Sequence, residues 1–396
     1  MKTFFKIIFL TLLVSGCSNK KNNHNILMNN DLFTVDLDNA EKRDTLFFSS
    51  LFKSVTCIPL ETTDNSLIGG IHKMLVYKNH IYILEKRYTQ VLFVFDKQGN
   101  FIRKIGNRGG GTGEYYQIHD FTINPDNDEI IIVADYKILF FDHLTGVYKN
   151  TVALQNRIAI SNIQYFNDIL YTDLREYSES SEGYLMQSIN LSTGEQEAKF
   201  LKANEYNKGY NEFIATEADR FTPTIEQPPY LFRQLFMDTF FALTTKGVQP
   251  YLTIKSKDFV TKNEIERFDR IHPDFIYGTN TIFVLYSYFS HNNYIHFMFR
   301  RMINEKNKIY SVLYDTKSNT TQIFDNCRND LLYKRGLMFS KFAFFDKSGV
   351  YEYISPFAMS SFLNIIKENG INDTIKDQLK GLNEESNPVI FFYEFK

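Results

Sequence analysis

The sequence predicts an all-β fold, and more narrowly a six-bladed β-propeller made of four-stranded antiparallel blades. Two observations support this prediction. First, residues 71–106 contain four short apolar runs separated by turn residues such as Lys78-Asn79 and Gln98-Gly99, which is the pattern of four antiparallel strands. Second, this pattern recurs along the chain. Four-stranded sheets that repeat in this way bury both of their faces when they pack around a common axis, which gives a propeller.

The first hairpin turn of each repeated unit gives the period. We expect this turn at six positions, namely Asn79, Asn127, Asn167, Asp238, Asn280 and Gly349. Separations of 48, 40 and 42 residues suit one unit each, whereas separations of 71 and 69 residues require insertions, so six units are predicted. A second hairpin turn recurs independently at Asp96, Asp142, Asn190 and Asp315, and that of the fourth unit is expected after Ile254.

Two insertions explain the longer separations. Residues 204–233 hold three prolines among polar residues, which predicts a long ordered loop between the third and fourth units. Residues 282–314 are rich in Phe and Tyr, and we expect lengthened strands there, around residues 290–293.

The carboxyl-terminal part combines helices with a strand that can close the ring. Residues 357–368 and 373–382 have helical spacing, with Asp373 as the expected N-cap. Either residues 54–60 or residues 389–395 can supply a strand from one terminus to a unit built by the other, so we expect both ends to meet in the last blade. An open six-unit solenoid is the alternative, but it requires polar caps that the sequence lacks.

The amino terminus has the features of an export signal. Lys2 and Lys6 precede an apolar stretch at residues 7–14 that is too short to span a bilayer, so residues 1–16 are expected to be a signal peptide. The run Leu13-Val14-Ser15-Gly16-Cys17 resembles the lipobox of bacterial lipoproteins. This resemblance implies cleavage before Cys17 and acylation of that cysteine. The alternative, an ordinary secretory signal with a chance cysteine, predicts cleavage without lipid.

Residues 17–45 are expected to form a lipidated flexible tether, because Asn, Lys and His dominate its first part and offer too little apolar surface to fold. The propeller domain is then expected over residues 46–396. In lipoproteins an Asp directly after the Cys is often a retention signal for the inner membrane. Ser18 stands there instead, so the resemblance favours the outer membrane and leaves the leaflet open.

Composition excludes some partners. The 44 Lys and Arg residues against 46 Asp and Glu leave a formal charge of -2, so we expect the chain to bind no nucleic acid. We also expect it to be a monomer. Trp is absent, which removes the commonest sugar-stacking side chain, although Tyr can still stack. Beyond Cys17 the chain has Cys57 and Cys327, which either pair in an oxidising compartment or serve as small buried hydrophobes.

Four local motifs carry a wider resemblance. They are Ile58-Pro59-Leu60-Glu61-Thr62, the segment 93–106, the loop 108–115 and the closing Asn387-Pro388-Val389-Ile390. These motifs resemble a family of bacterial lipoproteins described as six-bladed β-propellers and related in blade pattern to NHL repeats. The resemblance runs from residue 54 to the carboxyl terminus and implies the fold and a cell-envelope location. It implies no reaction, so function has to be argued from a site.

The glycine-rich segment 106–113 looks at first like a phosphate cradle. It lacks the Gly-Lys-Ser/Thr sequence and the following helix that a P-loop needs. We expect a tight crossover between two blades, in which glycines relieve backbone strain. The alternative is a nest of backbone amides beside Arg108 that holds a carboxylate or sulfate.

In a propeller, the loops that enter the innermost strands and the loops that follow the second strands open on the same face, where ligands usually bind. The candidate ligand-binding residues on this face are Glu85, Arg87, Arg108, His119, Asp135, Tyr136, Asp173 and Arg175. Their mixed charges suit a polar ligand or a peptide at a central mouth. The alternative is that the acidic residues share one repeat position because each caps its own turn.

The sequence contains neither a Gly-x-Ser-x-Gly elbow nor a His-Glu-x-x-His motif, and His291 and His296 are expected at the surface or in packing. We therefore favour a non-catalytic, outer-membrane-associated lipoprotein that binds a polar ligand, an envelope protein or a glycan at its mouth. The alternative is a Ca²⁺-dependent hydrolase or lyase acting on glycans or lactones, with oxygen ligands from Glu85, Asp135 and Asp173.

Overall fold

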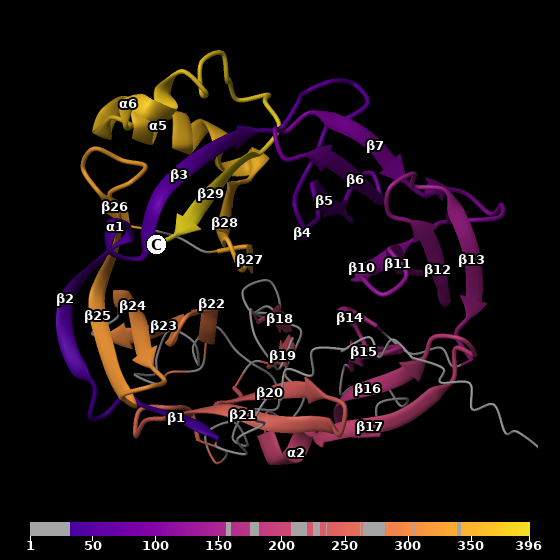
Figure 1. Cartoon of the computed structure of the whole chain (residues 1–396), viewed down its shortest axis with the longest axis horizontal. Coiled ribbons are helices and arrows are strands. Elements are labelled where there is room, and N and C mark those ends of the chain that lie inside the picture. The colour runs from indigo at the N-terminus through magenta and orange to yellow at the C-terminus, as the bar shows by residue number, and fades with distance from the viewer. Residues whose placement is uncertain are drawn as a thin grey trace, which may run out of the picture. The chain divides into compact units, whose positions relative to one another are not determined.

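Six sheets of at least four strands each are arranged in a ring, which confirms the predicted six-bladed β-propeller (Figure 1). The structure is a computed structural model, and it describes residues 32–155, 160–174, 182–206, 220–224, 230–234, 236–261, 263, 282, 284–303, 306–338 and 342–396. The signal peptide and Cys17 lie outside the described residues.

Blades 1 to 3 are each built from one continuous stretch of chain. From the axis to the rim, blade 1 consists of β4 (Lys73–Tyr77), β5 (His80–Glu85), β6 (Val91–Asp96) and β7 (Phe101–Ile105). Blade 2 consists of β10 (Ile118–Asn124), β11 (Glu129–Ala134), β12 (Lys137–Asp142) and β13 (Tyr148–Ala153). Blade 3 consists of β14 (Ile163–Phe166), β15 (Ile169–Asp173), β16 (Tyr184–Asn190) and β17 (Gln196–Lys202), followed by α2 (Ala203–Tyr206).

Blades 4 to 6 each include a strand from the amino-terminal part of the chain. Blade 4 has β18 (Phe221–Pro223), β19 (Tyr230–Phe232), β20 (Thr239–Thr244), β21 (Gly247–Lys255) and, at the rim, β1 (Phe33–Asp36). Blade 5 has β22 (Val284–His291), β23 (Tyr294–Ile303), β24 (Lys306–Asp315), β25 (Thr320–Asn329) and the rim strand β2 (Glu41–Phe47), with β26 (Leu337–Met338) paired to β25. Blade 6 has β27 (Phe344–Asp346), β28 (Gly349–Ile354), β29 (Val389–Phe395) and β3 (Phe52–Pro59).

We call β1, β2, the short helix α1 (Phe48–Leu51) and β3 the amino-terminal belt, because they follow one another around the rim of blades 4 to 6 (indigo in Figure 1). β1 and β2 pair in parallel with β21 and β25, whereas β3 pairs antiparallel with β29. Both chain ends therefore meet in blade 6, which confirms the predicted closure. Residues 33–45, which the sequence assigned to the tether, begin this belt.

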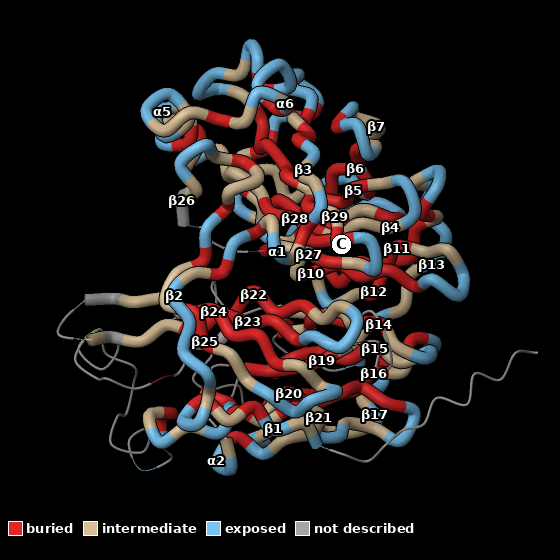
Figure 2. The backbone as a smooth tube through the Cα atoms, turned by 60° about the vertical axis from the view of Figure 1, so that its left-hand side comes forward, coloured by how far each residue is buried: buried red, intermediate tan, exposed pale blue. Residues whose placement is uncertain are grey.

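Inner strands are apolar on both faces because a neighbouring blade covers each face. In β5, Ile81 and Ile83 pack toward blade 6, while Tyr82 and Leu84 pack toward blade 2. Figure 2 shows the same contrast across blade 5, where the inner strands are buried and β2 at the rim is largely exposed. The sequences of the inner strands are therefore continuous apolar runs and do not alternate between apolar and polar residues.

The belt covers an aromatic core shared by blades 4 to 6. Phe52 is fully buried, and its ring lies 5.3 to 6.0 Å from those of Phe48, Phe289, Phe342, Tyr393 and Phe395. Cys57 and Cys327 are buried in the same core as free thiols, so they form no disulfide with each other. Burial raises the pKa of both thiols to about 12, which keeps them protonated and unreactive.

Four of the six positions predicted for the first hairpin turn are confirmed among the described residues. The turns at Asn79, Asn127, Asn167 and Gly349 join first to second strands as expected. Asp238 lies between β19 and β20, one strand later than predicted, because β18 and β19 are short strands within the segment taken for a loop. Asn280 lies outside the described residues.

In blade 5, the turn between the first two strands is at residues 292–293, and the three strands around it are lengthened, as predicted for this segment. In blade 4, the second hairpin turn falls at residues 245–246 and not after Ile254, so that expectation was wrong.

The segment between β28 and β29 carries the predicted helices. These are the 3₁₀ helix η2 (Pro356–Ala358), α5 (Met359–Asn369) and α6 (Asp373–Lys376). Asn372 rather than Asp373 occupies the N-cap position of α6, and no side-chain hydrogen bond caps that helix. No helix among the described residues is long and apolar enough to cross a membrane.

Candidate functional site

The upper face is defined here as the side on which each second strand ends. In blade 1 the antiparallel pairing of Lys73 with Leu84 places the start of β4 and the end of β5 at this face. The same pairing brings together Ile118 and Ala134 in blade 2, and Ile163 and Thr172 in blade 3. The loops that carry the predicted site residues therefore open on one face, as the sequence predicted.

Glu85, the last residue of β5, is buried and turned toward its own loop. Its carboxylate accepts hydrogen bonds from the amides of Arg87 (2.6 Å) and Tyr88 (2.9 Å) and from the amide and hydroxyl of Thr89. Burial acts to raise the pKa of Glu85, but the hydrogen bonds from Thr89, Tyr88 and Arg87 outweigh it, so the pKa lies below its ordinary value. The side chain holds the loop as an ionised cap.

Asp135 and Asp173 occupy the equivalent positions of blades 2 and 3, and they cap the loops that enter the innermost strands. Asp135 accepts from the amides of Tyr116 and Gln117, the latter at 2.9 Å. Asp173 accepts from the amides of Ser161 (3.1 Å) and Asn162 (2.7 Å). Glu85 therefore caps its own turn, as the alternative expected, whereas Asp135 and Asp173 cap the loop that precedes the innermost strand of their blade.

Polar contacts fix the upper-face loops of neighbouring blades to each other. Lys73 Nζ lies 2.7 Å from Asp120 Oδ2, and that same oxygen accepts the amide of Ile163 at 2.7 Å, so one ion pair links blades 1, 2 and 3. Lys86 Nζ donates to the carbonyl of His119 at 2.7 Å. The loop after β5 is thereby anchored to blade 2.

The remaining predicted residues are dispersed. Arg87 lies over the ring of Tyr88, with its guanidinium carbon 5.3 Å from the ring centre. Arg108 belongs to β8 (Asn107–Arg108), which pairs in parallel with β9 (Glu114–Tyr115) in the crossover between blades 1 and 2. Arg175 lies outside the described residues.

Exposed tyrosines are a feature of this face that the sequence analysis mostly missed. Tyr88, Tyr116 and Tyr136 are 55%, 61% and 48% exposed, and all three lie in upper-face loops of blades 1 and 2. Tyr136 also has a left-handed backbone, with φ of +61°. We call these three residues the tyrosine face. The sequence carries a signal for Tyr136, which directly follows Asp135, and for Tyr88, which closely follows Glu85. Tyr116 is brought to Asp135 only by the fold.

The glycine-rich crossover behaves as the predicted structural link. Gly113 has φ of +76°, and a Cβ there would lie 2.8 Å from the ring of Tyr148. The amide of Gly111 donates to the carboxylate of Glu114 at 2.8 Å. The Glu114 carboxylate therefore already binds the Gly111 amide, which is one donor of the nest that the sequence suggested.

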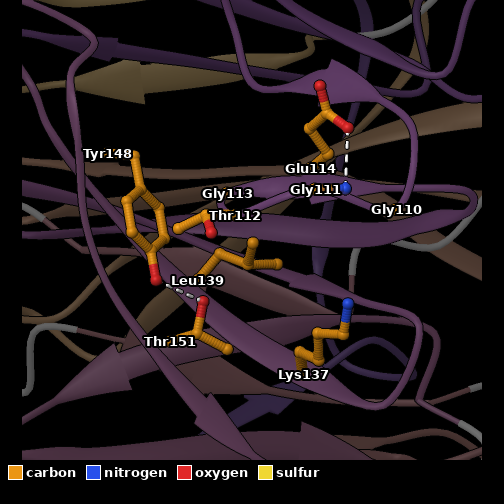
Figure 3. A pocket seen from close by; sticks show the side chains of 9 residues that line it. All are labelled: Gly110, Gly111, Thr112, Gly113, Glu114, Lys137, Leu139, Tyr148 and Thr151. Carbon is orange, nitrogen blue, oxygen red and sulfur yellow. Dashed lines mark hydrogen bonds between the residues drawn. The ribbon is translucent and has the colours of Figure 1, made fainter.

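A cavity of about 290 Å³ lies between this crossover and the outer strands of blade 2 (Figure 3). It is lined by Gly110, Gly111, Thr112, Gly113, Glu114, Lys137, Leu139, Tyr148 and Thr151. The Tyr148 hydroxyl donates to Thr151 Oγ1 at 2.9 Å along one wall. This cavity is separate from the predicted central mouth.

The remaining candidates are a metal site and the two histidines singled out in the sequence, His291 and His296. Within them, no group of three or more His, Cys, Asp or Glu side chains is placed to hold a metal ion. His296 is buried and stacks on Phe289, with ring centres 4.6 Å apart, and His291 stacks on Phe395 at 4.0 Å. Both histidines therefore serve in packing.

Comparisons with known proteins support the fold. A family model described as a domain of unknown function (DUF4934) matches residues 32–394. No protein of curated function matches the chain. The structure is similar to that of an exported protein from Bacteroides fragilis, with a TM-score of 0.68 and 16% identity over 92% of this chain and 100% of that chain. At this identity, the similarity establishes the fold alone.

More distant similarities include BamB from Moraxella catarrhalis, with a TM-score of 0.36 and 8% identity over 67% of this chain and 74% of that chain. A hydrazine synthase from Kuenenia stuttgartiensis gives a TM-score of 0.37 and 8% identity over 66% of this chain and 67% of that chain. Neither similarity bears on function.

Proposed function

The chain belongs to the DUF4934 family, and from this premise we propose that it is an exported, lipid-anchored β-propeller that binds a polar partner through its upper face without chemistry of its own. The tyrosine face carries this proposal. Tyrosine supplies a large, stiff and amphipathic contact area at low entropic cost, which suits it to recognition surfaces.

Tyr136 supports the proposal most directly. A left-handed backbone costs a residue other than glycine about 1 kcal/mol or more. Burial does little to offset this cost, since the side chain is 48% exposed. The two-residue turn between β11 and β12 requires this backbone at both Asp135 and Tyr136, and it presents the Tyr136 ring at the tip of the turn.

Rigid support for the tyrosines is the second argument. The loop that carries Tyr88 is capped by Glu85 and fixed to blade 2 by Lys86, and Asp135 caps the loop that carries Tyr116. A partner that meets loops already held in place loses less conformational entropy on binding. The same carboxylates that proved to be caps thus support a binding surface.

Export and anchoring are proposed from the amino-terminal pattern and from the exported protein of similar fold. If Cys17 is acylated, the full chain takes up labelled fatty acid and partitions with the outer-membrane fraction, whereas Cys17→Ser does neither. Uptake of label by the Cys17→Ser variant would contradict acylation at this residue.

The binding role is tested with a triple variant, Tyr88→Ala, Tyr116→Ala and Tyr136→Ala, in quantitative cross-linking to envelope components. We expect capture to fall by about tenfold, as for removal of several interface anchors, with little change in melting temperature. The matched control is Tyr294→Ala, since Tyr294 is 47% exposed at the opposite end of the strands. An equal loss in the control, or none in the triple variant, would refute the tyrosine face.

A further inference from the structure

The cavity beneath the crossover is lined by one cationic side chain, Lys137. Lys137, at the start of β12, extends toward the glycine run in Figure 3. Among the described residues, no carboxylate or carbonyl oxygen pairs with Lys137 Nζ. An unmatched ammonium beside a hollow favours a ligand that supplies an acceptor.

The charge of the lining limits what those acceptors can be. Lys137 is the one cationic side chain that lines the cavity, and Glu114 the one anionic side chain. In the view of Figure 3, the Gly111 amide lies between the Glu114 carboxylate and Lys137, and the carboxylate is bound to that amide. The single ammonium of Lys137 neutralises a ligand with one negative charge. A phosphate dianion would keep one unpaired negative charge and would be repelled by the nearby Glu114 carboxylate.

The rest of the lining is suited to a small organic body. The ring of Tyr148 provides apolar surface on the blade 2 side, while Leu139 is buried in the core behind the lining. Thr151 accepts from Tyr148, so its own hydroxyl hydrogen can donate to a ligand. The cavity volume, about 290 Å³, is near the lower end of the range for small-molecule pockets.

We propose that this cavity is a binding site for a small organic monocarboxylate, whose carboxylate pairs with Lys137 and whose body lies against the ring of Tyr148. The carboxylate could belong to an amino acid or peptide terminus, or to an acidic sugar. The site goes beyond the proposed function because it shares no residue with the tyrosine face. Loss of either site leaves the other testable.

Isothermal titration of the full-length chain tests this site with paired probes. N-acetyl-L-leucine is compared with N-acetyl-L-leucinamide, and D-glucuronate with D-glucose, so that each pair differs in its carboxylate. We expect one acid or both to bind at least about tenfold more tightly than the neutral partner, the effect of one charge-assisted hydrogen bond. The tighter acid identifies the source of the carboxylate. Failure of both acids to bind, or equally tight binding of inorganic phosphate, would overturn the proposal.

Two residues of the lining give opposite predictions. Lys137→Met is expected to remove the preference for the acid, and Lys137→Arg to keep most of it, with melting temperatures confirming that both fold. Glu114→Gln is expected to tighten acid binding by a few-fold, because it removes a repelling charge. Weaker acid binding in Glu114→Gln would contradict an anion site and indicate a neutral ligand that donates to Glu114.

Discussion

Blades 1 to 3 and blades 4 to 6 are held together in different ways. The first three blades have four strands each and no added strand at the rim, and a polar contact near the axis, Lys73 with Asp120, links them. The other three are bound at the rim by the amino-terminal belt over a shared aromatic core. The tyrosine face and the proposed cavity both lie on the unbelted side. The belt and the proposed binding surfaces therefore occupy different halves of one ring.

Removing a core contact of the belt is expected to have the largest effect. Phe52→Ala deletes a fully buried ring among five aromatic neighbours, and we expect it to lower the free energy of unfolding by about 3–5 kcal/mol in urea denaturation. Phe47→Ala is the matched control, since Phe47 is 44% exposed on the same segment, and its effect should stay within about 0.5 kcal/mol. Similar losses in the two variants would show that the belt does not hold the core.

Acid is expected to weaken the belted half through His296 in blade 5. Burial lowers the pKa of His296 to about 4 from 6.5, against the hydrogen bond that its Nδ1 makes to the Ser287 carbonyl. The unfolded chain therefore takes up this proton first. The stability contribution is complete above pH 6.5 and is lost as the pH falls toward 4, by about 3 kcal/mol.

The variant His296→Phe keeps the stacking on Phe289 but has no proton to take up. Its free energy of unfolding should fall less steeply between pH 6.5 and 4 than that of the natural chain, although the unpaired Ser287 carbonyl lowers it at all pH values. An unchanged slope would mean that other groups govern the acid response.

The smallest effect is expected at the junction of blades 1 and 2, on the unbelted side. Gly113→Ala combines a left-handed backbone with a Cβ 2.8 Å from the Tyr148 ring, and we expect a loss of about 2 kcal/mol. Gly183→Ala has a similar φ of +77° and no heavy atom within 4 Å of the added Cβ, so about 1 kcal/mol is expected. Equal melting temperatures for the two variants would show that Tyr148 yields to the added methyl.

The fold could be predicted from sequence where strands are long and their turns carry Asn, Asp or Gly. Asn79 and Asn167 mark such turns, and Asn167 has the left-handed backbone that Asn tolerates. The prediction failed at Asp238 because β18 and β19 have three residues each, too few to show a pattern. The belt strands β1 and β2 were missed because rim strands such as β2 are half solvated and carry charged residues.

The site could be predicted less well than the fold. The shared position of Glu85, Asp135 and Asp173 was recognised, but sequence spacing does not say whether a carboxylate turns outward to a ligand or inward to backbone amides. The structure shows each bound to amides of nearby loops. The position of Lys137 beside Gly110 and Thr151 could not be predicted, because only the folded crossover brings these residues near one another.

The seam between β3 and β29 also governs when the molecule can finish folding. The hydrogen bonds of this seam join residues 52–59 to residues 389–395, so every contact in it has a very large sequence separation and is expected to form late. Until the seven residues of β29 are available, blade 6 presents unpaired edges to its surroundings. This late closure suits a chain that crosses a membrane unfolded, because the propeller cannot close before its carboxyl-terminal strand has crossed.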